Sequence, residues 1–229
     1  MWDLLGKFLE DNVCWLVLGV VLLVLGLLLA PLRRSGLRTL ARELGLSFSA
    51  QDTLDLARRL DFRVFRQGRW RRVRNVLSGR YRGHTVCCFD FEMGYGRRLT
   101  DEAHSWTMVL VRTPCPYPEL HIRPEGVWDR AKEAVGLNDL DFESEDFSRR
   151  YHVTASDPKL AYAVLHPRAI ELLLSTDSLV IEGDESALLF RTQREGLLGA
   201  QDELVALLDI AVDFVALTPR YLTKEASST

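Results

Sequence analysis

Several signatures of catalytic and metal-binding proteins are missing from this sequence of 229 residues. Its four cysteines form no C-x-x-C pair and its five histidines form no H-x-x-x-H pair, so no metal site is expected. It also contains no P-loop, no G-x-G-x-x-G, no G-x-S-x-G and no H-E-x-x-H. From these absences we predict no catalytic residue, no metal and no cofactor.

The composition excludes three broad classes of protein. With 47% hydrophobic and 27% charged residues and a net charge of −3, the chain is neither a disordered polymer, nor a disulfide-stapled mini-protein, nor a uniformly basic nucleic-acid binder. The net charge is close to zero because regions of opposite charge cancel. Residues 33–82 hold fourteen arginines against four acidic residues, whereas residues 83–229 carry a large acidic excess.

A long apolar run precedes the basic zone. Residues 13–32 read VCWLVLGVVLLVLGLLLAPL, twenty residues without a charge, which as a helix would span about 30 Å of hydrocarbon. The run lacks the basic start and the cleavage site of a signal peptide, so we predict a transmembrane helix over 13–32; a buried core helix is the alternative. Arginines follow the run at 33, 34, 38 and 42, whereas Lys7 is the one basic side chain before it. The positive-inside rule therefore predicts a single-pass protein of the bacterial inner (plasma) membrane, with residues 1–12 extracytoplasmic and the C-terminal domain cytoplasmic, where disulfides are not expected.

Hydrophobic periodicity predicts an α+β fold, with an antiparallel β-sheet covered by helices, for the remainder of the chain. We divide it into a basic helical connector (33–71), a soluble domain (72–218) and a flexible tail (219–229). The predicted strands cover 73–79 and 84–92 (a hairpin), 106–113, a half-exposed 120–123, 151–155, and the hairpin 179–182 with 187–191. The predicted helices cover 37–44, 51–60, 124–136, 157–166, 168–174 and 201–217.

The strongest local signal is the arginine-rich stretch FRQGRWRRVRNV at 65–76. Cations beside an anionic leaflet each contribute about 1 kcal/mol, and a tryptophan among them suits an interfacial contact or stacking on a base. The predicted lipid- or partner-binding residues are Arg66, Arg69, Trp70, Arg71, Arg72 and Arg74. A solvated charge run is the alternative, as is pairing with the acidic zone of the same or a neighbouring chain; nucleic acid is the least favoured partner.

Two further patterns contain residue types that can carry chemistry. Cys88 and His104 fall on predicted neighbouring strands, where a cysteine–histidine nucleophile pair can be imagined, although their spacing does not single them out. The acidic run 138–146 resembles a calcium loop, but an EF-hand starting at Asp139 would need Gly and Glu where Ser144 and Arg150 stand. We interpret this run as a solvated loop.

Four short motifs carry a family resemblance: FDF at 89–91, RPEG at 123–126, DLDF at 139–142 and DFSRRY at 146–151. They resemble an uncharacterised bacterial family of small membrane-anchored proteins with a cytoplasmic α+β domain and no established activity, so the resemblance transfers no site. The function predicted is a membrane-tethered binding or scaffold module that contacts the lipid bilayer or a protein partner; self-association is left open. The alternative is a membrane-bound enzyme that uses a strand-borne Cys or His.

Overall fold

The computed structural model describes residues 15, 17–19, 21, 31–96, 103–113, 117, 119–125, 138–140, 142–184 and 186–219. Within these ranges no helix is both long enough and apolar enough to cross a membrane. Most of the predicted anchor 13–32 lies outside the described residues, as do residues 1–12, most of the predicted helix 124–136 and residues 220–229. The transmembrane anchor therefore stays a prediction.

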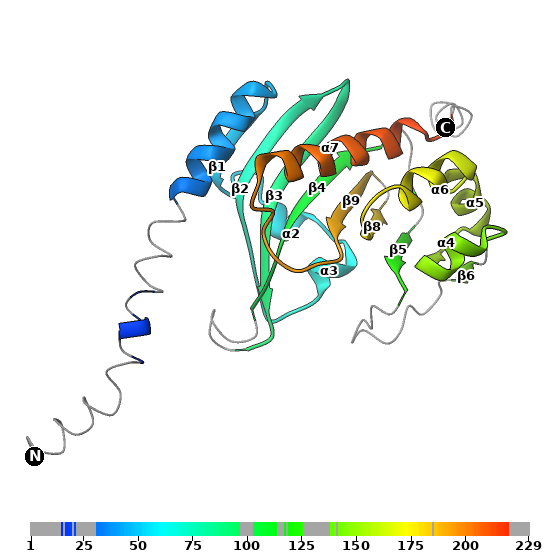
Figure 1. Cartoon of the computed structure of the whole chain (residues 1–229), viewed down its shortest axis with the longest axis horizontal. Helices are drawn as coiled ribbons and strands as arrows, with labels where there is room; N and C mark the ends of the chain where they lie inside the picture. The colour runs from blue at the N-terminus through cyan, green and yellow to red at the C-terminus, as the bar shows by residue number, and fades with distance from the viewer. Residues whose placement is uncertain are drawn as a thin grey trace, which may run out of the picture.

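In the part of the chain that the structure describes, nine strands form one antiparallel sheet in the order β1-β2-β3-β4-β9-β8-β5-β7-β6 (Figure 1). The result confirms the predicted α+β class with an antiparallel sheet. The strands are β1 Ser47–Gln51, β2 Trp70–Tyr81, β3 His84–Gly94, β4 Ala103–Arg112, β5 Leu120–Pro124, β6 Asn138–Leu140, β7 Tyr151–Ala155, β8 Leu179–Asp184 and β9 Ala187–Thr192.

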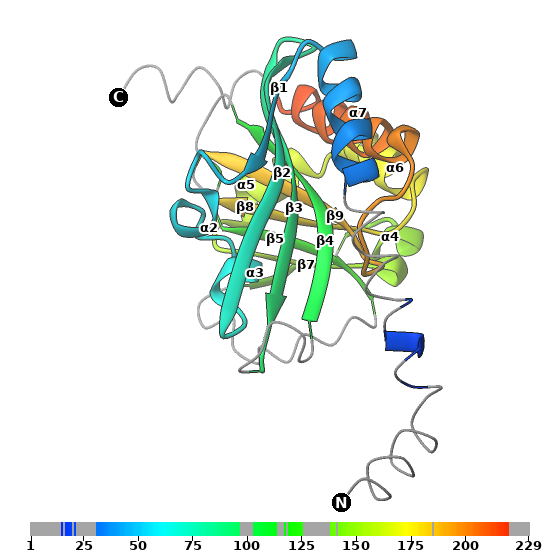
Figure 2. The same ribbon diagram turned by 90° about the vertical axis from the view of Figure 1, so that its left-hand side faces the viewer.

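Helices cover both faces of this sheet (Figure 2). Each face has its own hydrophobic core. One face carries the helical residues 31–43 together with α4 Glu145–Arg150, α5 Pro158–Val164, α6 Pro167–Leu174 and α7 Gln201–Ala216. The other face carries two short helices, α2 Leu56–Arg59 and α3 Arg63–Arg66. The sheet is therefore enclosed between two unequal layers.

The β2–β3 hairpin follows directly from local sequence. Arg82 and Gly83 have φ values of 47° and 86°, and two consecutive positive φ values match the twist of a two-residue hairpin turn. Side chains then alternate along β3: Phe89 and Phe91 enter the core under α3, whereas Cys88 faces the core under α7. The hairpin predicted for these two strands is confirmed.

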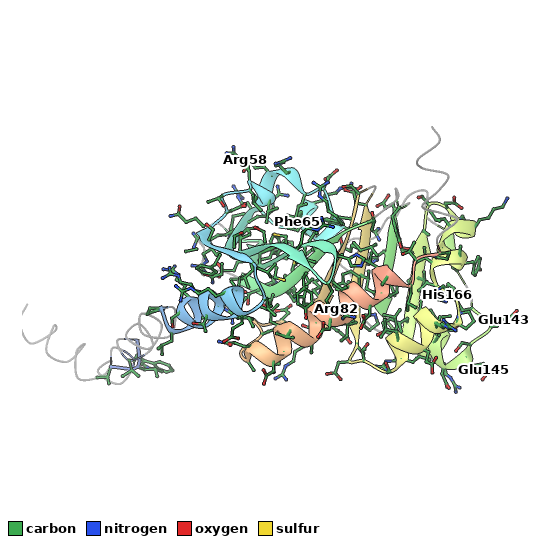
Figure 3. All side chains as sticks on the ribbon, turned by 90° about the horizontal axis from the view of Figure 1, so that it is seen from above. Arg58, Phe65, Arg82, Glu143, Glu145 and His166 are labelled. Atoms are coloured by element: carbon green, nitrogen blue, oxygen red, sulfur yellow. The ribbon has the colours of Figure 1, made fainter. Side chains whose placement is uncertain are left out.

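The segment 33–71 is not a connector, which corrects the predicted domain boundary. Leu37 and Leu40 belong to the core under α7, and Phe65 is fully buried in the core on the opposite face (Figure 3). The segment also contains β1, which pairs antiparallel with β2. β1 reads SFSAQ, too polar to be recognised as a strand from sequence, and its pairing at the sheet edge decides its conformation.

The strand predicted over 120–123 is present as β5, but the prediction that it is half-exposed is wrong. β5 lies between β7 and β8, and His121 is 2% exposed. Its Nδ1 lies 3.2 Å from a guanidinium nitrogen of Arg63. Burial, followed by the charge of Arg63, lowers the pKa of His121 to about 3; smaller contributions come from Arg191, Arg123 and His152.

Acidification is expected to destabilise the domain through His121. In the unfolded chain the imidazole titrates near about 6.5, whereas in the folded chain its pKa is about 3. Between these values the unfolded chain binds the extra proton. Stability is therefore complete above about pH 6.5 and falls toward pH 3, by on the order of 1 kcal/mol per pH unit. Urea unfolding of the full chain in detergent over this range measures the slope. His121→Gln should flatten it and His84→Gln should not; equal slopes in both variants would contradict the assignment.

Candidate functional site

The six predicted binding residues do not form one patch. Arg66 pairs with Asp61 at the surface, with Nε 2.9 Å from Oδ1. Arg69 and Arg71 are exposed. Side chains alternate along β2, so Arg71 lies on the same face of the sheet as Val73, which belongs to the core under α3. Arg72 lies on the other face, and its strand partner in the β2–β3 register is Glu92. The stretch is therefore divided between the two faces of the sheet.

Trp70, the aromatic member of this set, lies against the backbone of β3. It is half-buried and opposite Gly94, where a Cβ in place of the glycine hydrogen would come within 2.6 Å of its ring. A glycine is needed at position 94 for so close an approach of the ring. The ring thus packs on the sheet, whereas its Nε1–H is buried without a hydrogen-bond partner among the described residues.

Several arginines of the basic zone pair with the acidic zone of the same chain. Arg82 reaches across to α7, where its guanidinium lies 3.0 Å from Asp209 and 2.7 Å from Asp213 (Figure 3). Arg74 pairs with Glu92 on the neighbouring strand. Internal pairing was one of the interpretations that the sequence left open.

The imagined Cys88–His104 nucleophile pair is not formed. Cys88 lies opposite Val109 in the β3–β4 register, whereas His104 lies opposite Met93 and stacks on Trp106, on the other face of the sheet. Burial raises the pKa of the Cys88 thiol above its ordinary range. A protonated thiol without a base beside it is a poor nucleophile.

Both cysteines of β3 are expected to resist alkylation in the folded protein. Burial raises the pKa of the Cys87 thiol to about 12 and also raises that of Cys88. In a Cys14→Ser, Cys115→Ser background, labelling by iodoacetamide at about pH 8 should be at least about a hundredfold slower in the folded than in the urea-unfolded chain. Thr85→Cys, exposed on the same strand, is the reactive control. Rapid labelling of Cys88 in the folded protein would contradict the prediction.

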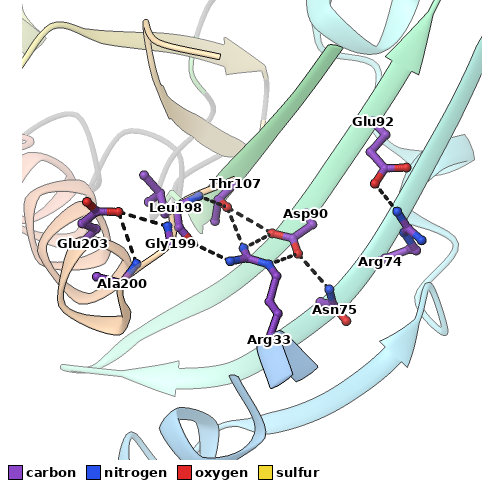
Figure 4. Close-up of polar contacts among 10 residues, drawn as sticks. All are labelled: Arg33, Arg74, Asn75, Asp90, Glu92, Thr107, Leu198, Gly199, Ala200 and Glu203. Carbon is purple, nitrogen blue, oxygen red and sulfur yellow. Dashed lines mark hydrogen bonds and ion pairs between the residues drawn. The ribbon is translucent and has the colours of Figure 1, made fainter. Parts of the chain in front are cut away.

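The structure instead brings together a buried polar network around Asp90 (Figure 4). Asp90, 2% exposed, accepts hydrogen bonds from Nε and one Nη of Arg33, at 2.9 and 2.6 Å. It also accepts from Asn75 at 2.8 Å and from the Thr107 hydroxyl at 3.0 Å. Two parallel bonds from one guanidinium to one carboxylate are the strongest arrangement that such a pair adopts.

This network joins three parts of the chain. The second Nη of Arg33 donates to the carbonyl oxygen of Leu198, and the Leu198 amide donates to the Thr107 hydroxyl at 3.0 Å. Glu203 accepts from the amides of Gly199 and Ala200, which holds the same loop at the start of α7. The start of helix 31–43, the centre of the sheet and the loop before α7 are thus held by one arginine.

A β-bulge positions Asn75 in this network. The β2–β3 register shifts between Arg74 and Leu77, and Asn75 has a φ of 52°, a conformation that asparagine tolerates better than most residues. The extra residue allows Asn75 to face Asp90 while Arg74, immediately before it, faces Glu92. The Oδ1 atom of Asn75 is buried and has no hydrogen-bond partner.

A groove of about 560 Å³ opens beside this network. Its polar wall consists of Arg33, Arg34, Arg74, Asn75, Asp90, Glu92 and Gln201, and its apolar wall includes Leu32, Leu37, Leu197, Leu198 and Leu204. Of the six predicted binding residues, Arg74 lines it. Since it combines buried polar groups with leucines, we regard the groove as the candidate site for an amphiphilic ligand.

One feature of the sequence points to this site. Asp90 is a carboxylate in the middle of the buried run VCCFDF, and a charge there needs a partner inside the fold. Its partner, Arg33, is 57 positions away, at the flank of the predicted anchor. No local pattern links the two residues.

No protein-family model matches this chain, and no curated protein matches it by sequence. Among solved structures, it is similar to the crystal structure of the mycobacterial trehalose monomycolate transport factor A, TtfA, with a TM-score of 0.57 over 80% of this chain and 90% of that chain. The two sequences are 13% identical, so the likeness is one of fold. The family resemblance of the four short motifs stays a prediction.

Proposed function

We propose that this chain is a membrane-tethered binding module of the bacterial inner membrane, with its N-terminus outside and its α+β domain on the cytoplasmic face. The observation that carries the proposal is the position of Arg33. It directly follows the apolar run 13–32 and is bonded to Asp90 in the centre of the sheet. A helix entering from the bilayer would thus be clamped to the domain rather than joined by a loose linker.

Two further features support this function. Leu37, Leu40 and Ala41 are buried in the core under α7, so the helix after the run is part of the domain. The protein of like fold is described as a transport factor, and a role that binds rather than converts its ligand is in keeping with that description. The enzyme alternative loses its one named nucleophile, because Cys88 and His104 face opposite sides of the sheet.

Topology is the experiment that tests this proposal. In a Cys-free background, a single cysteine is added after Thr229 and, in a separate variant, at Asp3→Cys. Intact spheroplasts are then treated with a membrane-impermeant maleimide. We expect Asp3→Cys to react in intact spheroplasts and the C-terminal cysteine to react only after lysis.

The opposite pattern would place the domain outside the cytoplasm and overturn the orientation. Recovery of the chain in the soluble fraction after carbonate extraction would overturn the tether itself. Cys87 and Cys88 are buried, so their replacement can disturb the core. Near-ultraviolet circular dichroism of the Cys-free chain therefore checks that the domain is still folded.

A further inference from the structure

The groove is lined by one more positive than negative side chain. Two arginines at its wall are paired within the chain, Arg33 with Asp90 and Arg74 with Glu92. Arg34, the third, is exposed at the rim. Three guanidinium groups therefore face two carboxylates, a balance that a ligand with one negative charge would complete.

The apolar wall of the groove lies where the predicted anchor ends. Leu32, the last residue of the run 13–32, lines the groove and is 65% exposed. Leu37 and Leu204 continue this wall toward the core. If the run spans the bilayer, the groove opens at the level of the lipid headgroups, and its leucines are placed for the part of a lipid that adjoins the acyl chains.

The polar floor of the groove offers an unused acceptor. Asn75 is 9% exposed, and its amide nitrogen is committed to Asp90, which fixes the amide orientation. The remaining Oδ1 atom is buried without a donor. A buried acceptor without a donor is costly, so a hydroxyl group brought by a ligand would stabilise the site.

We propose that the groove binds the headgroup of a glycerophospholipid that carries one phosphate and free hydroxyls, of which phosphatidylglycerol is the simplest. The phosphate accepts hydrogen bonds from Arg34 and Arg74 at the rim. A headgroup hydroxyl donates to Oδ1 of Asn75, and the glycerol end of the acyl chains contacts Leu32 and Leu37. This inference rests on the proposed membrane tether, because only a chain held at the bilayer brings the groove to the leaflet.

The test uses the full chain in phosphatidylcholine nanodiscs that contain a photoactivatable phosphatidylglycerol, with the reactive group near the glycerol end of one acyl chain. After illumination, crosslinked peptides are mapped by mass spectrometry. We expect crosslinks within residues 31–37 and 197–204. Their yield should be at least about fivefold higher than with the matching phosphatidylcholine probe, and unlabelled phosphatidylglycerol should compete.

Matched variants separate the groove from general attraction to the bilayer. Arg34→Gln with Arg74→Gln should lower the crosslink yield more than about tenfold, since each change removes a charged hydrogen bond to the phosphate that contributes about tenfold or more. Arg71→Gln with Arg80→Gln removes the same charge from exposed positions on β2 and should change the yield less than twofold. Asn75→Gly keeps the positive φ and removes the acceptor, so it should also lower the yield.

The outcomes distinguish the two proposals. Loss of the chain from the nanodisc overturns the membrane tether, and the lipid source with it. A retained chain that crosslinks equally to both probes, or that responds equally to both double variants, overturns the groove assignment alone. Crosslinks removed by soluble glycerol 3-phosphate would assign the groove to a free polyol phosphate and overturn the lipid as its ligand. Near-ultraviolet circular dichroism identifies any variant that has lost its fold.

Discussion

Asp90→Ala is expected to lower the free energy of unfolding of the domain by about 3–5 kcal/mol, the usual cost of removing one partner of a buried ion pair. Asp90 accepts four hydrogen bonds, two from Arg33 and one each from Asn75 and Thr107. Its removal leaves these donors without an acceptor in a region with little access to water. For a domain of this size the change corresponds to a decrease in Tm of roughly 10 °C. Heating the full chain in detergent, followed by near-ultraviolet circular dichroism, measures it.

Two comparisons make this result specific to the pair. Asp61→Ala breaks the surface pair with Arg66 and should cost less than about 1 kcal/mol, because solvent screens exposed charges. Arg33→Ala combined with Asp90→Ala should cost less than the sum of the two single changes, because both remove the same bonds. Additive costs would show that Arg33 and Asp90 are not coupled, and would remove the clamp on which the proposed function depends.

The second large effect is expected from Phe65→Ala in the short helix α3. The Phe65 ring is fully buried, and its centroid lies 4.4 Å from that of Phe91 and 6.2 Å from that of Phe89. Truncation of a buried phenylalanine leaves a cavity and typically costs about 3–5 kcal/mol. Urea unfolding of the full chain in detergent, monitored by near-ultraviolet circular dichroism, measures the loss.

Arg66→Ala, at the next position, is the matched control. Its side chain points to solvent and pairs with Asp61, so its removal should change stability by less than about 1 kcal/mol. A small effect of Phe65→Ala would mean that residues 33–71 are a connector outside the domain, as the predicted domain division had it. The contrast between these adjacent residues tests whether the basic zone belongs to the domain.

Local chemistry was sufficient to predict most of the helices and hairpins. The Asp157 side chain accepts from the amides of Lys159 and Leu160, and Pro158 occupies the first turn of α5, as a capping residue followed by proline predicts. Helix α7 runs over Gln201–Ala216, close to the predicted 201–217. These features depend on residues a few positions apart, so the sequence pattern contains them completely.

Edge strands were harder to predict because neighbouring strands stabilise them. β6 covers Asn138–Leu140 in the acidic run interpreted as a solvated loop, and it pairs with β7. Three residues with two polar side chains have no strand preference of their own. Here, as for β1, hydrogen bonds from a neighbouring strand decide the conformation.

The sequence by itself determined the elements with strong periodicity, the turn at Arg82-Gly83, the alternation along β3 and the long apolar run that predicts an anchor. The tertiary structure alone decided that Arg33 meets Asp90 and that His121 is buried. It also decided that the arginine-rich stretch divides between the two faces of the sheet. The physical reason is distance along the chain: the contacts that make the groove join positions up to 165 residues apart. They depend on the strand order of the whole sheet, which no local pattern specifies.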